Sequence, residues 1–398
     1  MHPSEAIRCT KGRELEGRRI VLGITGSIAA VESFELVREL MRHGAEVTVV
    51  MSPEGAKLVT PWAMEFASGR PVITELTGKV EHVSLFGDYP GKADMLLVAP
   101  CTANTISKMA LGIDDTPVTT MATVAIGSRA PVLVAPAMHL AMYEHPAVKE
   151  NVKRLEDMGV GFVGPVVRDK KARVATIDEI VERVLADLGP NDLRGKRVLV
   201  IGGSTEEPID QVRIISNTGT GESAVQIALA ASRRGASVEL WAGRMSVPVP
   251  ATVARRTFRT VQEILDMVDE VDHDAVIVPA SLSDYAPPAK EGKISSGKKE
   301  LKITMRPLPK VLPTLRPRTK VLVGFKAEID VTPDELMRRA RARLEDHGLD
   351  LIVANDLRDV RSGRTKAVLV TRSEEIPFEG SKAQLADRIL DVVAKVLR

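Results

Sequence analysis

The sequence predicts an α/β protein built from two tandem doubly wound, Rossmann-like domains. Short unbroken runs of Val, Ile and Leu alternate with helical segments, a pattern typical of parallel sheets covered on both faces. The chain also opens twice in the same way, with a Gly-basic-Arg lead-in to an apolar strand at 20–23 and again at 198–201. Between these openings, Gly189-Pro190 follows an amphipathic stretch at 177–188 and reads as a helix stop. We therefore place the domains at 1–188 and 189–398.

Composition excludes several classes of protein. The 398 residues carry a net charge of +2, so no global field favours nucleic acid or a membrane surface. Aromatic residues make up 3%, which leaves few platforms for stacking bases, and no apolar run reaches the ~18 residues of a membrane span. Two cysteines and an opening segment without a signal-peptide core are typical of the reducing cytosol. We expect a soluble cytoplasmic protein without nucleic-acid or membrane partners.

Polar residues follow the strands of the first half, where ligands of doubly wound sheets bind. Gly26 and Ser27 follow the first strand, and Thr102 and Asn104 follow a later one. A helix that begins with such residues offers free backbone N–H groups to a phosphate, although an ordinary helix cap is an equal alternative. His82 and His139 are isolated, and by composition alone each is more often structural than catalytic.

The second half contains a formal GxGxxA motif, Gly219 to Ala224. A dinucleotide fingerprint should directly follow the first strand, yet Gly219 lies well beyond Ile201, and this spacing argues against an NAD site. A Lys/Gly/Ser-rich loop at 290–299 is either solvated or a mobile lid that neutralises triphosphate charge.

The order of motifs in the first half carries a resemblance. Four stretches occur in this order at three strand ends, namely Gly26-Ser27-Ile28-Ala29-Ala30, Pro100 to Lys108 (PCTANTISK), Gly112-Ile113-Asp114-Asp115 and Pro136-Ala137-Met138. Residues 18–177 thereby resemble the flavin-dependent cysteine decarboxylases, in particular the phosphopantothenoylcysteine decarboxylase domain of coenzyme A biosynthesis. The resemblance implies a flavodoxin-like fold, His82 as the active-site base, and an FMN site lined by Gly26, Ser27, Ser52, Thr102 and Asn104.

Two departures from this family concern catalysis. Bacterial members read Pro-Ala-Met-Asn, and that Asn holds the substrate carboxylate; this chain has His139, which can still donate a hydrogen bond and which archaeal-type members share. The bacterial substrate flap also carries a cysteine, whereas the equivalent stretch here, 168–173, has none. We count His139 among the catalytic residues and leave open which group protonates the enethiol.

The second half resembles phosphopantothenate–cysteine ligase over 195–370. The resemblance rests on the segments 205–217 (TEEPIDQVRIISN), Asp284-Tyr285, Lys293-Ile294, Val323-Gly324-Phe325 and 350–356 (DLIVAND). It implies that CTP with Mg2+ activates the substrate carboxylate as an acyl-cytidylate, which cysteine then attacks. Asn217 would stabilise the carboxylate and Lys293 would reach the phosphates. The implied nucleotide-binding residues are Ala280, Asp284, Lys293, Phe325, Arg343 and His347.

This half also departs from its family. The usual Arg-Ser-Ser-Gly-Lys-Met-Gly after the Asn is replaced by residues 218–224, which puts Glu222 at the position of the family Lys. Two family lysines before the DLIVAND segment appear here as Arg343 and His347, which keep the positive character of these positions only in part. No metal ligand is assigned.

The whole chain thus resembles the fused bifunctional enzyme of coenzyme A synthesis. Its expected substrates are 4'-phosphopantothenate, L-cysteine and CTP, its product 4'-phosphopantetheine, and its expected state a homo-oligomer as large as a dodecamer. One alternative is a flavin-binding regulatory subunit with an inactive decarboxylase half, because His139 replaces the Asn. A two-domain NAD(P) oxidoreductase is a second alternative, and it rests only on the GxGxxA match.

Overall fold

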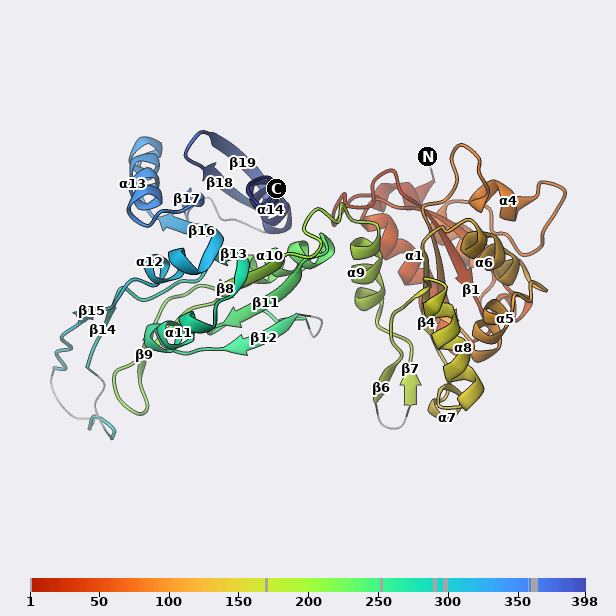
Figure 1. The fold of residues 1–398 in the computed structure, drawn as a ribbon, viewed down its shortest axis with the longest axis horizontal. Helices are drawn as coiled ribbons and strands as arrows, with labels where there is room; N and C mark the ends of the chain where they lie inside the picture. The colour runs from red at the N-terminus through yellow and green to blue at the C-terminus, as the bar shows by residue number, and fades with distance from the viewer. Residues whose placement is uncertain are drawn as a thin grey trace. The chain divides into compact units, whose positions relative to one another are not determined.

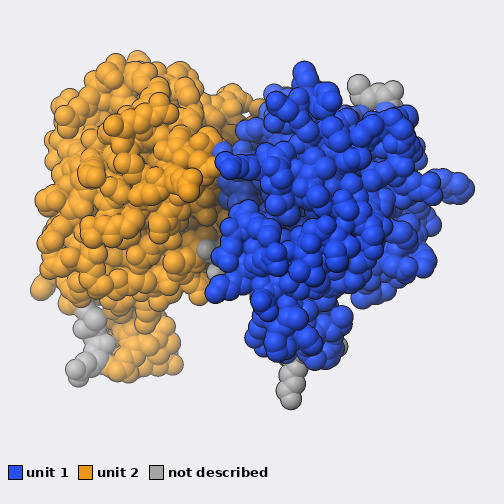
Figure 2. All heavy atoms as spheres, turned by 45° about the vertical axis from the view of Figure 1, so that its right-hand side comes forward, with its two compact units in different colours: residues 1–189 blue, residues 190–398 orange. Residues whose placement is uncertain are grey.

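A computed structural model describes residues 2–168, 171–250, 253–288, 292–295, 300–356, 358 and 364–398. The chain forms two compact units, Met1–Gly189 and Pro190–Arg398 (Figure 2). The division falls within the predicted Gly-Pro helix stop. Each unit contains a mainly parallel sheet with helices on both faces, which confirms the predicted α/β class (Figure 1).

Unit 1 is built on a five-stranded parallel sheet in the order β2-β1-β3-β4-β5. This is the flavodoxin-like order, and its topological switch point lies between β1 and β3. Loops that leave the carboxyl ends of these two strands diverge to opposite faces and leave room for a ligand. The strands are β1 (Arg19–Ile24), β2 (Glu46–Met51), β3 (Met95–Cys101), β4 (Val132–Pro136) and β5 (Gly161–Phe162).

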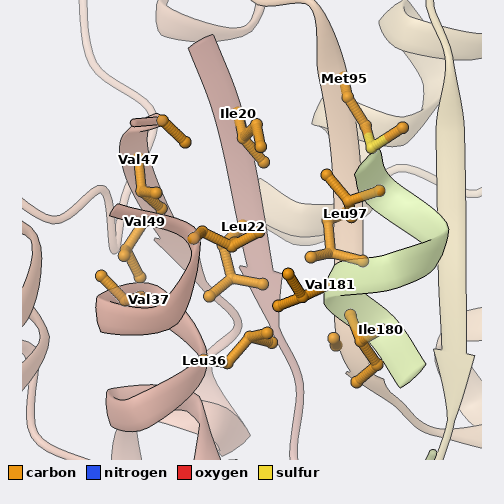
Figure 3. Close-up of a cluster of buried hydrophobic side chains, with 14 of the residues drawn as sticks. Ile20, Leu22, Leu36, Val37, Val47, Val49, Met95, Leu97, Ile180 and Val181 are labelled. Atoms are coloured by element: carbon orange, nitrogen blue, oxygen red, sulfur yellow. The ribbon is translucent and has the colours of Figure 1, made fainter. Parts of the chain in front are cut away.

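Alternate residues of these strands enter two separate cores. Ile20 and Leu22 of β1 pack against α1 and α9, as Figure 3 shows, whereas Val21 points to the opposite core. Since successive side chains of a strand face opposite ways, one strand supplies both layers. The first core involves α1 (Ser33–Arg42), α3 (Pro61–Ser68) and α9 (Ile177–Asp187), and the second α5 (Ala103–Leu111), α6 (Pro117–Gly127) and α8 (Pro146–Asp157).

Short elements complete unit 1 around the carboxyl edge of its sheet. The 3-10 helix η2 follows β1, α2 follows β2, and α4 lies between β2 and β3. Helix α7 follows β4, and β6 pairs with β7 as an antiparallel hairpin. Their bounds are η2 (Ile28–Glu32), α2 (Pro53–Leu58), α4 (Glu81–Phe86), α7 (Leu140–Tyr143), β6 (Val166–Arg168) and β7 (Lys171–Arg173).

Unit 2 contains an eight-stranded sheet in the order β12-β11-β8-β13-β16-β17-β18-β19. The first six strands are parallel in the Rossmann order, and β18 and β19 add antiparallel to one edge. The switch point lies between β8 and β13. The strands are β8 (Arg197–Gly202), β11 (Ser237–Ala242), β12 (Ala254–Thr257), β13 (His273–Val278), β16 (Thr319–Glu328), β17 (Leu351–Asp356), β18 (Arg364–Val370) and β19 (Glu375–Ser381).

Helices cover the two faces of this sheet unequally. Helices α10 (Glu222–Arg233) and α14 (Lys382–Val396) pack on one face, and α11 (Val261–Met267), α12 (Val311–Leu315) and α13 (Pro333–Asp346) on the other. Two ribbons, β9 (Glu206–Pro208) with β10 (Ile214–Ser216) and β14 (Tyr285–Ala286) with β15 (Arg306–Pro307), complete the unit. None of the helices in the described part of the chain is both long and apolar enough to cross a lipid bilayer.

Sequence signals set the ends of several helices. Helices α6, α9 and α14 each begin with a capping box, in which the N-cap hydroxyl and the third residue satisfy each other's backbone N–H groups. Helix α14 starts in this way at Lys382, after Ser381 as its cap. Its first turn is therefore fixed at the edge of the sheet where the strands β8, β13, β16 and β17 end.

Candidate functional site

In unit 1, Thr25 ties together the two loops at the switch point. Its hydroxyl donates to the Pro100 carbonyl at 2.7 Å and accepts from the Thr102 N–H at 3.1 Å. Thr25 is buried, so these bonds are shielded from water. The loop after β1 and the loop after β3 therefore keep a defined separation. Sequence analysis missed Thr25. The signal that could have found it is a polar residue at the end of an apolar strand.

The loop after β1 fits closely against the start of α2. A Cβ on Gly26 would lie 2.6 Å from the Cβ of Glu54, so only glycine fits there without a shift. Ser52 is buried, and its hydroxyl accepts from the Gly55 N–H at 3.1 Å as a helix cap. The Ser27 hydroxyl makes no capping bond to η2. Among these predicted flavin contacts, Ser27 is thus available to a ligand, whereas Ser52 mainly shapes the loop.

Thr102 and Asn104 lie at the start of α5, after β3. The Thr102 hydroxyl caps the helix by accepting from the Thr105 N–H at 3.2 Å, and Asn104 is exposed in the first turn. Lys108, one turn later, forms an ion pair with Asp115 at 2.7 Å and so fixes the loop after this helix. Hydroxyls, an amide and the N–H groups of a helix start together suit an anion. These residues fit the phosphate of a flavin mononucleotide.

His82 lies on α4, the helix between β2 and β3. Its Nδ1 atom is buried and has no hydrogen-bond partner among the described residues. Among the described residues, no hydrogen bond joins His82 to Ser27, Thr102 or Asn104. The predicted base therefore keeps an unused ring nitrogen, but the structure does not link it to the strand-end loops.

His139 is the N-cap of α7. Its Nδ1 accepts a hydrogen bond from the Ala141 N–H at 3.2 Å, so this nitrogen carries no proton. In the neutral ring the proton then resides on Nε2, which is left as a donor on an exposed side chain. The cap thus selects the tautomer that can replace an asparagine amide as a hydrogen-bond donor.

Neither cysteine offers a ready proton donor near these loops. Cys101 is buried at the end of β3, and burial raises the pKa of its thiol, which keeps it protonated and away from solvent. Of the predicted flap, residues 169 and 170 lie outside the described part of the chain. The group that protonates the enethiol is therefore not identified.

In unit 2, a cavity of about 680 Å³ opens at the carboxyl ends of β8 and β13, the switch point of the sheet. It gathers residues that are distant in the sequence and that were predicted to bind substrates. Those that line it are Asn217, Ala280, Asp284, Phe325, Arg343 and His347. The Asn217 amide donates to the Ser281 carbonyl at 3.0 Å, which joins the loops on either side of the switch point.

The α12–α13 side of this cavity is cationic. Lys310 pairs with Asp284 at 2.5 Å, and Arg343 and His347 lie nearby on α13 and at its end. Burial lowers the pKa of His347, and the positive charges of Arg343 and Lys310 act in the same direction. Arg343 Nε and His347 Nδ1 are buried without a hydrogen-bond partner among the described residues. Buried polar atoms are normally paired, so these two indicate a polar ligand.

The GxGxxA motif lies at this cavity, although it does not directly follow β8 in the sequence. The ribbon β9–β10 is inserted between β8 and α10, so the motif is distant from β8 in sequence but returns to its carboxyl end. Gly221 has φ 80°, and a Cβ on Gly202 would lie only 2.1 Å from the Cβ of Ala224. The motif therefore packs the start of α10 directly against β8 and lines the cavity.

Lys293 is the predicted nucleotide residue that does not line the cavity in this structure. Its neighbour Ile294 is held by Asp210, whose carboxylate accepts from the Ile294 N–H at 3.0 Å. Sequence analysis missed three lysines that do line the cavity, Lys310, Lys326 and Lys382. No motif marked them, since they belong to separate helices and strands.

No cluster of three or more His, Cys, Asp or Glu side chains suited to a metal ion occurs among the residues that the structure describes.

Both units of the chain are similar to known protein families. The family model described as Flavoprotein matches residues 8–189, and that described as DNA/pantothenate metabolism flavoprotein C-terminal domain matches 193–397. The Coenzyme A biosynthesis bifunctional protein CoaBC of Thermococcus kodakarensis is 45% identical over 406 aligned residues, covering 100% of both chains. Its counterpart in Methanocaldococcus jannaschii is 36% identical, covering 100% of this chain and 98% of the other.

A solved structure of the C-terminal domain of a CoaBC protein covers 52% of this chain and 98% of its own, at 26% identity and a TM-score of 0.43. Both family models and the full-length relatives agree on the arrangement of the two halves. The chain belongs to the family of CoaBC bifunctional proteins of coenzyme A biosynthesis.

Proposed function

We propose that this chain catalyses two consecutive steps of coenzyme A biosynthesis. Unit 2 ligates 4'-phosphopantothenate to L-cysteine with CTP, and unit 1 decarboxylates the product to 4'-phosphopantetheine with FMN. The observation that carries the ligase half is the cavity of unit 2, where unpartnered Arg343 and His347 atoms meet the Asn217 loop. The observation that supports the flavin half is the pair of loops joined by Thr25 at the β1/β3 switch point.

The ligase reaction proceeds in two transfers. A carboxylate oxygen of 4'-phosphopantothenate attacks the α-phosphorus of CTP, the bond to the β-phosphate oxygen breaks, and pyrophosphate leaves. The cysteine amine then attacks the acyl carbon, loses a proton, and CMP leaves. Lys310 and Arg343 are placed to neutralise charge that develops on the phosphates, and the neutral ring of His347 to donate a hydrogen bond to them, with Mg2+ as the expected companion ion.

Asn217 lies where the two substrates would meet. One N–H of its amide donates to the Ser281 carbonyl, which leaves its second N–H and its oxygen free for the acyl group. Lys293 acts on the nucleotide phosphates in this proposal, and it needs the segment around Ile294 to approach the cavity. Phe325 and Ala280 supply apolar surface beside the nucleotide.

In unit 1, bound FMN would oxidise the cysteinyl carbon–sulfur unit, which makes an electron sink for the loss of CO2, and would return the hydride afterwards. The residues of this chain hold the flavin and orient the substrate. Ser27 and Asn104 bind the flavin, with Gly26, Ser52 and Thr102 shaping the loops, and His82 takes the proton. His139 donates from Nε2 to the substrate carboxylate, which favours an active half over a regulatory one.

We also propose that the protein acts in the cytoplasm as a homo-oligomer, as the resemblance implies. Light scattering of the purified protein measures the size of this assembly, for which a dodecamer is expected. A monomer would contradict this part of the proposal.

Two assays on the purified protein test the proposed function. The visible spectrum should show oxidised flavin and no bound nicotinamide. With 4'-phosphopantothenate, CTP, Mg2+ and carboxyl-labelled cysteine, pyrophosphate release should precede release of labelled CO2. CO2 release without a need for CTP, or pyrophosphate release without cysteine-dependent product, would contradict the assignment of the two halves.

A further inference from the structure

Lys382 and Glu222 form an ion pair inside the cavity of unit 2. Lys382 Nζ lies 2.6 Å from Glu222 Oε2, although the two residues are 160 positions apart. Both side chains line the cavity, and that of Lys382 is only 19% exposed. Lys382 is the first residue of α14, and Glu222 is the first residue of α10.

The pair lies on the opposite side of the sheet from the cations already described. Helices α10 and α14 share one core, and α12 and α13 share the other. The cavity therefore has basic side chains on each side of the sheet edge, with Lys310 and Arg343 on one side and Lys382, paired with Glu222, on the other. Asn217, which bonds to the Ser281 carbonyl, belongs to the loops between them.

The two substrates of the proposed ligase also carry negative charge at two separate ends, as the cavity carries basic residues on two sides. CTP carries its triphosphate at one end of the reacting pair, and 4'-phosphopantothenate carries its phosphate far from the carboxylate that reacts. Since the reacting carboxylate and the α-phosphate must meet near Asn217, the two anionic ends point away from each other. Given the proposed function, on which this step rests, we infer that Lys382 binds the phosphate of 4'-phosphopantothenate.

Glu222 is a positioning residue in this arrangement. An ammonium group has three N–H donors, and the bond to Glu222 uses one of them, which leaves two for phosphate oxygens. The carboxylate lies in the first turn of α10, where the partial positive charge of the helix start offsets its own.

A purely structural role makes a different prediction. An ion pair that only joins α10 to α14 would change stability slightly and would affect all substrates alike. A phosphate contact instead changes the affinity for one substrate. Lys382→Met removes the charge with little loss of side-chain length, Lys382→Arg keeps it, and Lys395→Met removes an exposed charge from the far end of the same helix.

The experiment measures KM for 4'-phosphopantothenate and for CTP separately, by pyrophosphate release from the full chain. Lys382→Met should raise KM for 4'-phosphopantothenate by about 10- to 100-fold and leave KM for CTP within about twofold, because one hydrogen bond between charged groups is lost. Lys382→Arg should recover most of this change. Lys395→Met and the wild type should be alike.

An unchanged KM for 4'-phosphopantothenate, or an equal rise in KM for CTP, would overturn the inference. Failure of the proposed function looks different, because the wild-type protein itself would then release no pyrophosphate. In that case, equilibrium dialysis with labelled 4'-phosphopantothenate still decides the question. Weaker binding by Lys382→Met than by Lys395→Met supports the phosphate contact, and equal binding overturns it.

Discussion

The Asp210 carboxylate accepts a hydrogen bond from the Ile294 N–H at 3.0 Å, which joins segments 84 residues apart. The same carboxylate accepts from the N–H groups of Val212 and Arg213 at 2.8 and 2.7 Å, and its side chain is fully buried. The bond from Ile294 contributes most to holding the pKa of Asp210 well below its usual range. Asp210 thus anchors the segment that carries Lys293.

Asp210→Asn should loosen this anchor, because the new amide cannot accept from all of these N–H groups. We expect hydrogen exchange at residues 292–295 to become about tenfold faster, because roughly one hydrogen bond to a charged group is lost. Asp266→Asn, at an exposed position on α11, is the control. Unchanged exchange at Ile294 would contradict the anchoring role.

The same anchor has a defined pH dependence. The folded pKa of Asp210 lies below its unfolded value of about 3.9, so its stabilisation is complete above that value. It is lost as the pH falls through the folded pKa. Between neutral pH and about pH 5 Asp210 stays ionised, so titration of this carboxylate should not make hydrogen exchange at residues 292–295 faster.

Gly26→Ala should empty the flavin site. Its Cβ would lie 2.6 Å from the Cβ of Glu54, and relief of such overpacking by a loop shift typically costs about 1–3 kcal/mol. Flavin absorbance per chain of the purified variant measures the loss. Gly127→Ala is the matched control, because nothing lies within 4 Å of the added atom. Full flavin content in Gly26→Ala would show that this loop does not approach the cofactor.

His82→Asn should leave flavin bound but stop decarboxylation, since the flavin contacts come from other loops. Loss of a general base usually lowers the rate by a factor of ~100–10,000. Release of labelled CO2 is the measurement, and CTP-dependent pyrophosphate release by unit 2 is the internal control. Decarboxylation at the wild-type rate would mean that another group is the base.

His139→Ala and His139→Asn should differ. Alanine removes both the cap of α7 and the Nε2 donor, whereas asparagine is a good N-cap and offers an amide N–H. Hydrogen bonds to charged groups contribute about 1.5–3 kcal/mol, so the alanine variant should lose about 10- to 100-fold in decarboxylation while asparagine retains much of it. Wild-type rates in both variants would mean that the side chain only packs and caps.

Substitutions at Lys293 and Asn217 should separate the two ligase transfers. Lys293→Gln removes a cation that faces the phosphates and should slow formation of the acyl-cytidylate. Asn217→Asp should still permit some activation but impede transfer to cysteine, because the new carboxylate repels the substrate carboxylate and misorients the mixed anhydride. Rapid quench with labelled CTP should show the intermediate accumulating only in the Asn217 variant. Identical stalling of both variants before any cytidylate forms would contradict this division.

The alternation of apolar strands and helices was sufficient to predict both doubly wound units. Strand and helix periodicities specify which side chains are buried, and local Gly-Pro and cap signals mark where elements end. Because parallel strands end at one edge, the residues after β1 and β3, and after β8 and β13, were also expected to bind ligands. Ser27, Thr102, Asn217 and Asp284 do lie at those edges.

Only the tertiary structure decided which distant side chains meet there. Periodicity does not encode the pairing of Lys382 with Glu222 or of Lys310 with Asp284, because each pair joins elements that are separate in the sequence and that only the fold brings together. Spacing along the chain did not show that the Gly219–Ala224 motif returns to the end of β8, since the residues of the β9–β10 ribbon lie between them in the sequence. The cap that selects the His139 tautomer likewise depends on a backbone N–H whose direction the folded loop determines. The local spacing of apolar residues thus determines which side chains are buried, whereas the packing of whole helices determines which charged side chains meet at a site.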